Sequence, residues 1–135
     1  MKAIHIIILL SLLGFVISLF SFSHLNAAVC PVGGCESVQQ STYGYAFGLP
    51  NSLIGIAGFG ILFVLAFVAR SRKSEVLFAF LAAGCVLAGL LALWFLFVQA
   101  VLLRTFCTLC LVADAAGVCL LILGIRLAVR ALSRQ

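Results

Sequence analysis

Charged side chains are scarce in this sequence. Lysine and arginine number 8, aspartate and glutamate only 3, and charged residues make up 8% of the chain against 66% hydrophobic residues. A soluble domain has roughly 25% charged and about 45–50% apolar residues, so this composition excludes that class. The mean hydropathy of +1.39 agrees with this conclusion. We therefore expect an integral membrane protein.

The length limits what else the chain can contain. The 135 residues leave room for one small domain, spanning 1–135, and for no separate soluble catalytic module. Whatever chemistry the protein performs is therefore expected to take place within or beside the bilayer.

Four apolar runs are long enough to cross a membrane, for which a helix needs about 20 residues. The expected spans are 4–22, 53–69, 76–103 and 107–125. A cleaved signal peptide is the alternative for the first run, because Lys2 gives a basic start and 26–28 resembles a cleavage site. That run, however, exceeds the ~7–15 apolar residues of such peptides. The pattern predicts an all-α membrane protein, a four-helix transmembrane bundle.

Residues 23–52 form the long polar stretch of the chain and contain no lysine or arginine. Glycines and Pro50 are typical of a loop, whereas 35–42 can form a turn or two of helix. Tyr43, Tyr45 and Phe47 give this loop an aromatic side that can lie at headgroup level or cover the bundle. We expect an external loop with a short-helix cap.

Basic residues fall almost entirely on one side of the expected spans. That side carries Lys2, Arg70, Arg72, Lys73, Arg126, Arg130 and Arg134, and the other side carries Arg104. Positively charged loops stay in the cytoplasm, so both termini are expected there and the 23–52 loop outside a cell inner (plasma) membrane. In a bacterium or archaeon that external compartment tolerates disulfides. Because orientation accounts for the net charge of +5, that charge does not indicate nucleic-acid binding.

The cysteines divide into two groups. Cys85 and Cys119 lie within spans, where cysteine behaves as a small apolar side chain. The other four gather at the outer membrane face, two in the loop (Cys30 and Cys35) and two in a CxxC motif at the start of the fourth span (Cys107 and Cys110).

The CxxC motif predicts redox chemistry. Two thiols three positions apart share a helix face, and the N–H groups and dipole of a helix start favour thiolate. With a second pair in exchange range, the four cysteines predict an electron relay. Two inert structural disulfides, or a zinc ion held by the four cysteines, are the alternatives.

Asp114 is the acidic residue within an expected span. Positions 110, 111 and 114 fall on one helical stripe, so Asp114 should face the same pocket as the thiols, about 10 Å inside the helix start. A carboxylate there is costly and is therefore expected to be functional or paired. It either hydrogen-bonds a neighbouring helix or handles protons in the reaction.

The arrangement of these features resembles the vitamin K epoxide reductase family. The resemblance is carried by the four spans, the two loop cysteines, Ser41, Tyr43-Gly44, Phe47-Gly48, Asn51-Ser52 opening the second span, and the CxxC motif opening the fourth. It covers nearly the whole chain. It implies a quinone-dependent membrane thiol oxidoreductase that generates disulfides in an external thioredoxin-like partner.

The resemblance also implies a path for the electrons. Cys35 would exchange with Cys107, Cys30 would meet the external partner, and Cys110 would lie beside a bound quinone of the ubiquinone or menaquinone type. No thioredoxin-like domain accompanies the four spans in this sequence, so the thioredoxin-like partner is expected to be a separate periplasmic or extracellular protein.

Other positions are implied to serve the quinone. Asn51 resembles the quinone-binding asparagine of the family, and Ser41 resembles its loop hydroxyl, a candidate gate or proton relay. Phe47 and Asp114 are further candidates to contact the quinone, and no metal is expected. An apolar ring with two acceptor oxygens needs a dry pocket with one or two donors, to which Trp94 or Phe106 could add aromatic walls.

Two departures from the family pattern affect the prediction. Only four residues separate the loop cysteines, fewer than in vertebrate members, and Asp114 stands where those enzymes have a tyrosine near the quinone. These departures argue against epoxide reduction, so vitamin K quinone or epoxide reduction proper is an alternative and not the main prediction. A non-enzymatic membrane subunit braced by structural disulfides is the other alternative. Another family of disulfide-generating membrane oxidases has its CxxC in the first outer loop, and that order does not match this chain.

Overall fold

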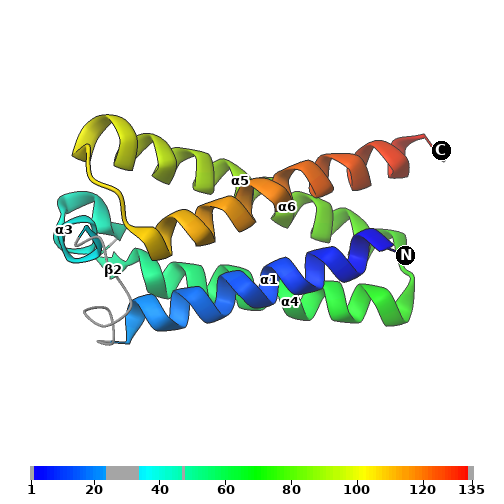
Figure 1. The fold of residues 1–135 in the computed structure, drawn as a ribbon. Helices are drawn as coiled ribbons and strands as arrows, with labels where there is room; N and C mark the ends of the chain where they lie inside the picture. Colours follow the sequence, from blue (N-terminus) through cyan, green and yellow to red (C-terminus); the bar gives the residue numbers. More distant parts are fainter. Residues whose placement is uncertain (1, 24–33, 47, 134–135) are drawn as a thin grey trace.

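The computed structural model describes residues 2–23, 34–46 and 48–133, for 35 and 36 the backbone only. It contains four helices long and apolar enough to cross a membrane (Figure 1). They are α1 (Lys2–Phe22), α4 (Asn51–Arg72), α5 (Glu75–Phe97), which continues as the π-helical turn η2 (Val98–Leu103), and α6 (Thr108–Leu132). The predicted all-α, four-helix membrane fold is confirmed.

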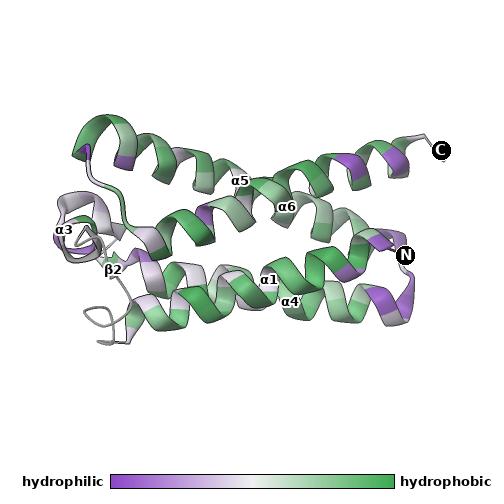
Figure 2. Ribbon diagram, viewed as in Figure 1, coloured by the Kyte–Doolittle hydropathy of each residue, from purple (hydrophilic) through white to green (hydrophobic). Residues whose placement is uncertain are grey.

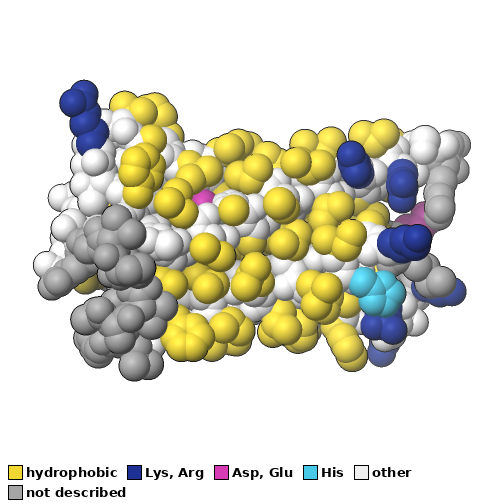
Figure 3. Space-filling view, in the orientation of Figure 1, with side chains coloured by type: hydrophobic (Ala, Val, Ile, Leu, Met, Phe, Trp, Pro, Cys, Tyr) yellow, Lys and Arg dark blue, Asp and Glu magenta, His cyan; other side chains and the backbone are white. Residues whose placement is uncertain are grey.

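The four long helices are hydrophobic along most of their length (Figure 2), and apolar side chains cover the face of the bundle seen in Figure 3. Leu9, Phe80 and Leu132 are 64–71% exposed, a degree of exposure that water would penalise and a lipid environment does not. The inward faces are instead rich in glycine, alanine and serine, such as Ser11 and Ala66. Small residues let membrane helices approach closely. The helices are therefore held together by close van der Waals packing and not by hydrophobicity alone.

The helices pack most extensively in two pairs, α1 with α4 and α5 with α6, and α4 meets α5 much less. In the first pair, a Cβ at Gly14 would lie 2.5 Å from the Phe59 ring. In the second pair, a Cβ at Gly117 would lie 2.6 Å from Cβ of Ala92. Close approach within each pair, and looser contact between α4 and α5, leaves space inside the bundle.

A small cap covers one end of the bundle. It consists of α3 (Cys35–Gln40), the 3₁₀ turn η1 (Thr42–Gly44), and two short antiparallel strands, β1 (Tyr45–Ala46) and β2 (Leu49–Pro50). The expected short helix is present and ends at Gln40. The two-residue strands were not predicted, because two residues are too few for an alternating pattern.

The helix boundaries differ from the expected spans in one informative way. α6 continues past the expected end at 125 to Leu132, so Arg126 and Arg130 lie on the helix and not on a tail. Arginine propagates a helix about as well as leucine does. Its charge limits how far the helix is buried in the membrane and does not end the helix itself.

The two ends of the bundle differ in charge (Figures 1 and 3). Both chain ends lie beside the turn between α4 and α5, and Lys and Arg side chains gather there. The cap and the start of α6 lie at the opposite end, where Arg104 follows η2 in a left-handed conformation (φ 49°). The CxxC motif therefore lies at the end of the bundle with little positive charge.

Candidate active site

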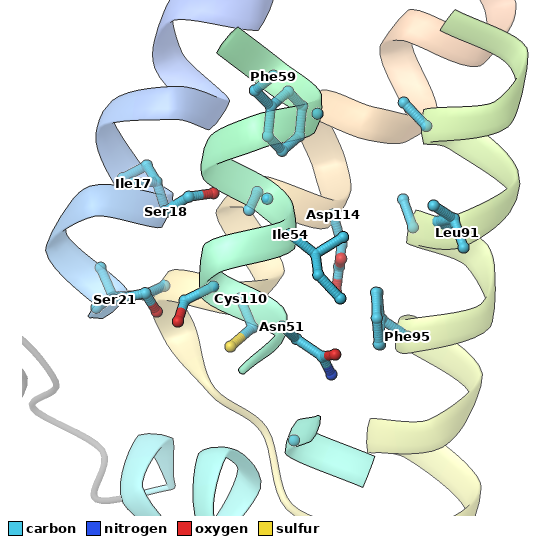
Figure 4. A pocket seen from close by; sticks show the side chains of 18 of the residues that line it. Ile17, Ser18, Ser21, Asn51, Ile54, Phe59, Leu91, Phe95, Cys110 and Asp114 are labelled. Carbon is cyan, nitrogen blue, oxygen red and sulfur yellow. The ribbon is translucent and has the colours of Figure 1, made fainter. Parts of the chain in front are cut away.

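A cavity of about 350 Å³ lies inside the bundle, bounded by α1, α4, α5, η2, α6 and the cap (Figure 4). Pockets that bind small molecules have about 300–1,000 Å³. Its position corresponds to the loose contact between α4 and α5, which pack less extensively than α1 with α4 or α5 with α6.

The cavity is polar at the cap end and apolar toward the middle of the bundle (Figure 4). The polar lining residues are Ser18, Ser21, Gln39, Tyr43, Asn51, Ser52, Gln99, Cys110 and Asp114. Farther along α4 and α5, the lining is aliphatic and aromatic, with Phe59, Leu62, Leu65, Leu87 and Leu91. This gradient suits a ligand with a polar head and an apolar body or tail.

The two CxxC thiols face different surroundings. Cys110 is half-buried and lines the cavity. Cys107 is 0% exposed, does not line the cavity, and forms with Leu109 a small buried cluster against which Val38 of α3 packs. It is the N-cap of α6, and its Sγ accepts a hydrogen bond from the backbone N–H of Cys110 at 3.3 Å. One thiol thus faces the cavity and its neighbour faces the cap, as a relay through the motif requires.

Hydrogen bonds at the helix start favour the thiolate of Cys107, which precedes the spanning helix. The hydrogen bond from the Cys110 side chain contributes most, burial opposes it, and the backbone N–H groups of Cys110 and Leu109 add to it. Together they lower the pKa of the Cys107 thiol to about 7. The thiolate of Cys107 is therefore favoured over that of an ordinary cysteine.

The first turn of α3 lies against the segment that leads into the CxxC motif. Gly34 has an ordinary helical conformation (φ −93°, ψ −12°), yet a Cβ there would meet the carbonyl oxygen of Phe106 and would lie 3.0 Å from Cγ2 of Thr105. Glycine is therefore required by close approach and not by backbone conformation. Because Gly34 precedes Cys35 and Phe106 precedes Cys107, the backbones of these two cysteines are neighbours.

Asp114 belongs to a buried polar network that the sequence did not reveal. Gln99 of η2 donates from Nε2 to Oδ2 of Asp114 at 2.9 Å, and its Oε1 accepts from the backbone N–H of Cys107 at 3.1 Å. Asp114 also lines the cavity beside Cys110, as its helical spacing predicted, and it makes the expected hydrogen bond to a neighbouring element, whereas its role in proton transfer stays a prediction. The one available signal for Gln99 was an amide within the apolar run 76–103.

Asn51 lies at the start of α4 and lines the cavity at its polar end (Figure 4). Its Nδ2 donates to the carbonyl oxygen of Tyr43 at 2.6 Å, which fixes the orientation of the amide. Within 2–23, 34–46 and 48–133, the buried Oδ1 has no hydrogen-bond partner. The amide thus keeps one N–H and one acceptor for a ligand.

The other candidate residues do not line the cavity or lie outside the residues that the structure describes. Oγ of Ser41 donates to the carbonyl oxygen of Val38 at 2.7 Å and does not line the cavity, so its role as a gate or proton relay stays a prediction. Cys30, Phe47 and the side chain of Cys35 lie outside the described residues.

The two suggested aromatic walls were wrong. Trp94 and Phe106 are 53% and 52% exposed and do not line the cavity. Phe59 and Phe95 supply the phenyl rings instead. The sequence pattern could not separate Trp94 from Phe95, because the run 76–103 is apolar on every face.

Comparison with known proteins gives one family. Residues 5–125 match the model described as the vitamin K epoxide reductase family. A search of curated proteins found no match. The matched range covers nearly all of the four helices together with the cap, the cavity, and the CxxC motif.

Proposed function

This chain belongs to the vitamin K epoxide reductase family, and on that premise we propose that it is a quinone-reducing thiol oxidoreductase. In this proposal, it generates disulfides in a separate, external thioredoxin-like protein and passes the electrons to a membrane quinone. The protein lies in the cell inner (plasma) membrane with both termini in the cytoplasm. The basic end of the bundle supports that orientation, because positive charge favours the cytoplasmic side.

The proposal rests on the different surroundings of the two CxxC thiols. Cys110 lines the cavity, whereas Cys107 is buried in the cluster against which α3 packs. Electrons that enter through Cys107 can therefore leave through Cys110 into the cavity. A structural disulfide would gain nothing from this arrangement, nor from hydrogen bonds that favour a thiolate.

The chemistry balances without another reactant. When the Cys107 and Cys110 thiols join as a disulfide, two electrons and two protons are released, and a quinone takes up the same number to become a quinol. A bound quinone supplies the two-electron acceptor. The chain supplies the thiols, an apolar cavity that excludes water, and groups that can hold a proton beside Cys110.

The polar end of the cavity fits both redox forms of a quinone. The second N–H of Asn51 can donate to a quinone oxygen, and the unpartnered Oδ1 can accept from a quinol hydroxyl. Asp114 lies in the same cavity and can exchange a proton with the oxygen. The apolar lining of α4 and α5 can receive the ring and its isoprenoid tail. These features suit ubiquinone and menaquinone alike.

In the proposed relay, the external partner reduces the loop pair at Cys30, and Cys35 then exchanges with Cys107. Support comes from the close contact between Gly34 and Phe106, the residues that precede Cys35 and Cys107. Each exchange is an attack by a thiolate on a disulfide sulfur, for which the lowered pKa of Cys107 is suitable.

The direct test is turnover by purified protein. We expect it to reduce a short-chain ubiquinone or menaquinone when supplied with a reduced thioredoxin-like protein, and to oxidise one dithiol for each quinol formed. Quinone absorbance and thiol titration measure the two sides. Failure to reduce either quinone with protein or small dithiols, in folded and monodisperse protein, would contradict the proposal.

Removing Cys30 is expected to separate the two donors. The Cys30→Ala variant should lose turnover with the thioredoxin-like protein, because the shuttle can no longer be reduced, and keep turnover with a small dithiol that reaches the CxxC motif directly. Both rates are measured by quinone absorbance. If both activities fall together, Cys30 has a structural role, and if neither falls, no shuttle is needed.

Adding a side chain at Gly34 is expected to slow exchange between the loop and the CxxC motif. Gly34→Ala forces a Cβ against the carbonyl oxygen of Phe106, so α3 must move away from Cys107. We expect turnover with the thioredoxin-like protein to fall roughly tenfold or more, since displacements of about 1 Å can cost 10²-fold. Turnover with a small dithiol should persist.

Gly60→Ala is the matched control. A Cβ at Gly60 would lie 3.4 Å from the nearest side chain, that of Phe15, which is ordinary contact, and Gly60 does not line the active-site cavity. This variant should keep both activities. Normal turnover of Gly34→Ala with the protein donor would show that docking of α3 on the Phe106 segment does not limit the relay.

A further inference from the structure

Gln99 connects the Asp114 carboxyl to the CxxC motif through hydrogen bonds. It is 2% exposed and lies in the π-helical turn η2, between the end of α5 and the start of α6. Its amide contacts the Asp114 carboxyl on one side and the Cys107 backbone on the other. Its own carbonyl oxygen accepts from the backbone N–H of Thr105 at 3.2 Å. The connection into the CxxC motif is therefore anchored to this residue at two points.

The two side-chain contacts leave the Gln99 amide only one orientation. Oε1 must face the N–H of Cys107, because an NH₂ group there would oppose another donor. Nε2 then faces Oδ2 of Asp114, and this oxygen must act as an acceptor. Whenever Asp114 carries a proton, that proton is consequently displaced to its other oxygen, Oδ1.

We propose that Gln99 is a positioning residue that directs the Asp114 proton into the quinone cavity. The inference rests on the proposed quinone reduction and assigns to Gln99 a part in it. Asp114 lines the cavity together with Cys110, so a proton on Oδ1, the oxygen that does not accept from Gln99, can be offered to a quinone oxygen bound in that cavity. The π-helical turn makes this possible, since such turns shift side chains relative to a regular helix and are frequent at functional sites.

The test uses Gln99→Met, which keeps the length of the side chain and removes both hydrogen bonds. We expect kcat for quinone reduction with a small dithiol to fall roughly tenfold, by loss of proton placement. Gln99 also lines the cavity, but its amide oxygen and one of its N–H groups are already engaged by Cys107 and Asp114, so KM for the quinone should change less than kcat. Thr105→Val is the matched control: it removes a hydroxyl that, among the described residues, donates to the Leu103 carbonyl oxygen, and it spares the amide network.

A spectroscopic measurement separates positioning from packing. Asp114 is the single aspartate of the chain, so ¹³C-carboxyl-labelled aspartate gives one labelled carboxyl in the infrared spectrum. Loss of the N–H donor should shift the labelled band in Gln99→Met and leave it in place in Thr105→Val. If Gln99→Met does not give monodisperse protein, Gln99→Glu is measured in its place. The glutamate lacks the NH₂ donor of Gln99, so the labelled Asp114 carboxyl band should again shift.

Each outcome bears on the inference. An unmoved band, an unchanged kcat, or an equal loss in Thr105→Val would overturn the role of Gln99. A wild-type protein that reduces no quinone would instead overturn the proposed function. The infrared comparison needs only folded protein, so the hydrogen-bond assignment can hold or fail separately.

Discussion

Cys110→Ala is expected to abolish quinone reduction and to accumulate a disulfide between Cys35 and Cys107. Cys110 is the CxxC thiol that lines the cavity, so its removal eliminates the route from the motif to the quinone. Losses after removal of a reacting nucleophile are very large, and we expect at least about a 10³-fold fall in turnover. Cys107 keeps its place beneath α3 and can still attack Cys35, but no neighbouring thiol resolves the bridge.

Mass spectrometry of the unreduced, alkylated variant measures the trapped bridge, and quinone absorbance measures the lost activity. Cys119→Ala is the matched control, because Cys119 is exposed on the outer surface of α6 and lies outside the cavity. It should behave as wild type. Recovery of Cys35 and Cys107 as free thiols, or paired only with other partners, would rule out the proposed order of transfer.

Changes at Asp114 are expected to slow quinone reduction and to spare thiol exchange. Asp114→Asn keeps an acceptor for Gln99 and gains an N–H donor, but it cannot shuttle a proton, so we expect a roughly tenfold slower reduction. Asp114→Leu removes both functions and should cost about 10²-fold, within the usual range for a lost acid–base group. Exchange between the loop cysteines and the CxxC motif takes place at Cys107, which does not line the cavity that Asp114 lines. We therefore expect exchange among the four thiols to stay near normal.

Stopped-flow absorbance of prereduced protein mixed with quinone gives these rates. The leucine variant leaves Nε2 of Gln99 buried without its acceptor, at a cost of about 1–3 kcal/mol. Its folding is therefore checked first by size-exclusion chromatography and helical content. Equal rates of quinone reduction for wild type and a folded leucine variant would show that Asp114 has a packing role only.

The helices could be predicted from the sequence because the membrane imposes a simple requirement. An apolar run must be long enough to cross the hydrocarbon, and in this chain each such run is one helix. The placement of Cys107 at a helix start followed from where the fourth run begins. The placement of Asn51 at the opening of α4 followed from the family resemblance, since the expected second span begins at 53. The stripe from Cys110 to Asp114 followed from helical spacing, and both residues line the cavity.

The remaining features depend on tertiary packing. Gln99 could not be recognised, because one amide hardly alters the hydropathy of an apolar run, and the π-helical turn changes which way it faces. The exposure of Trp94 and Phe106 depends on how α5 and the CxxC segment rotate against their neighbours. The requirement for glycine at position 34 arises from contact with Phe106, far away in the sequence.

The central claim is that the Cys107–Cys110 dithiol reduces a quinone held in this cavity. A single-turnover experiment tests it most directly: prereduced protein lacking Cys30 and Cys35 is mixed anaerobically with one equivalent of quinone. Quinol is measured by absorbance and the disulfide by mass spectrometry. We expect equal amounts of quinol and of Cys107–Cys110 disulfide. Quinol formed without that disulfide, or no quinol from folded protein, would contradict it.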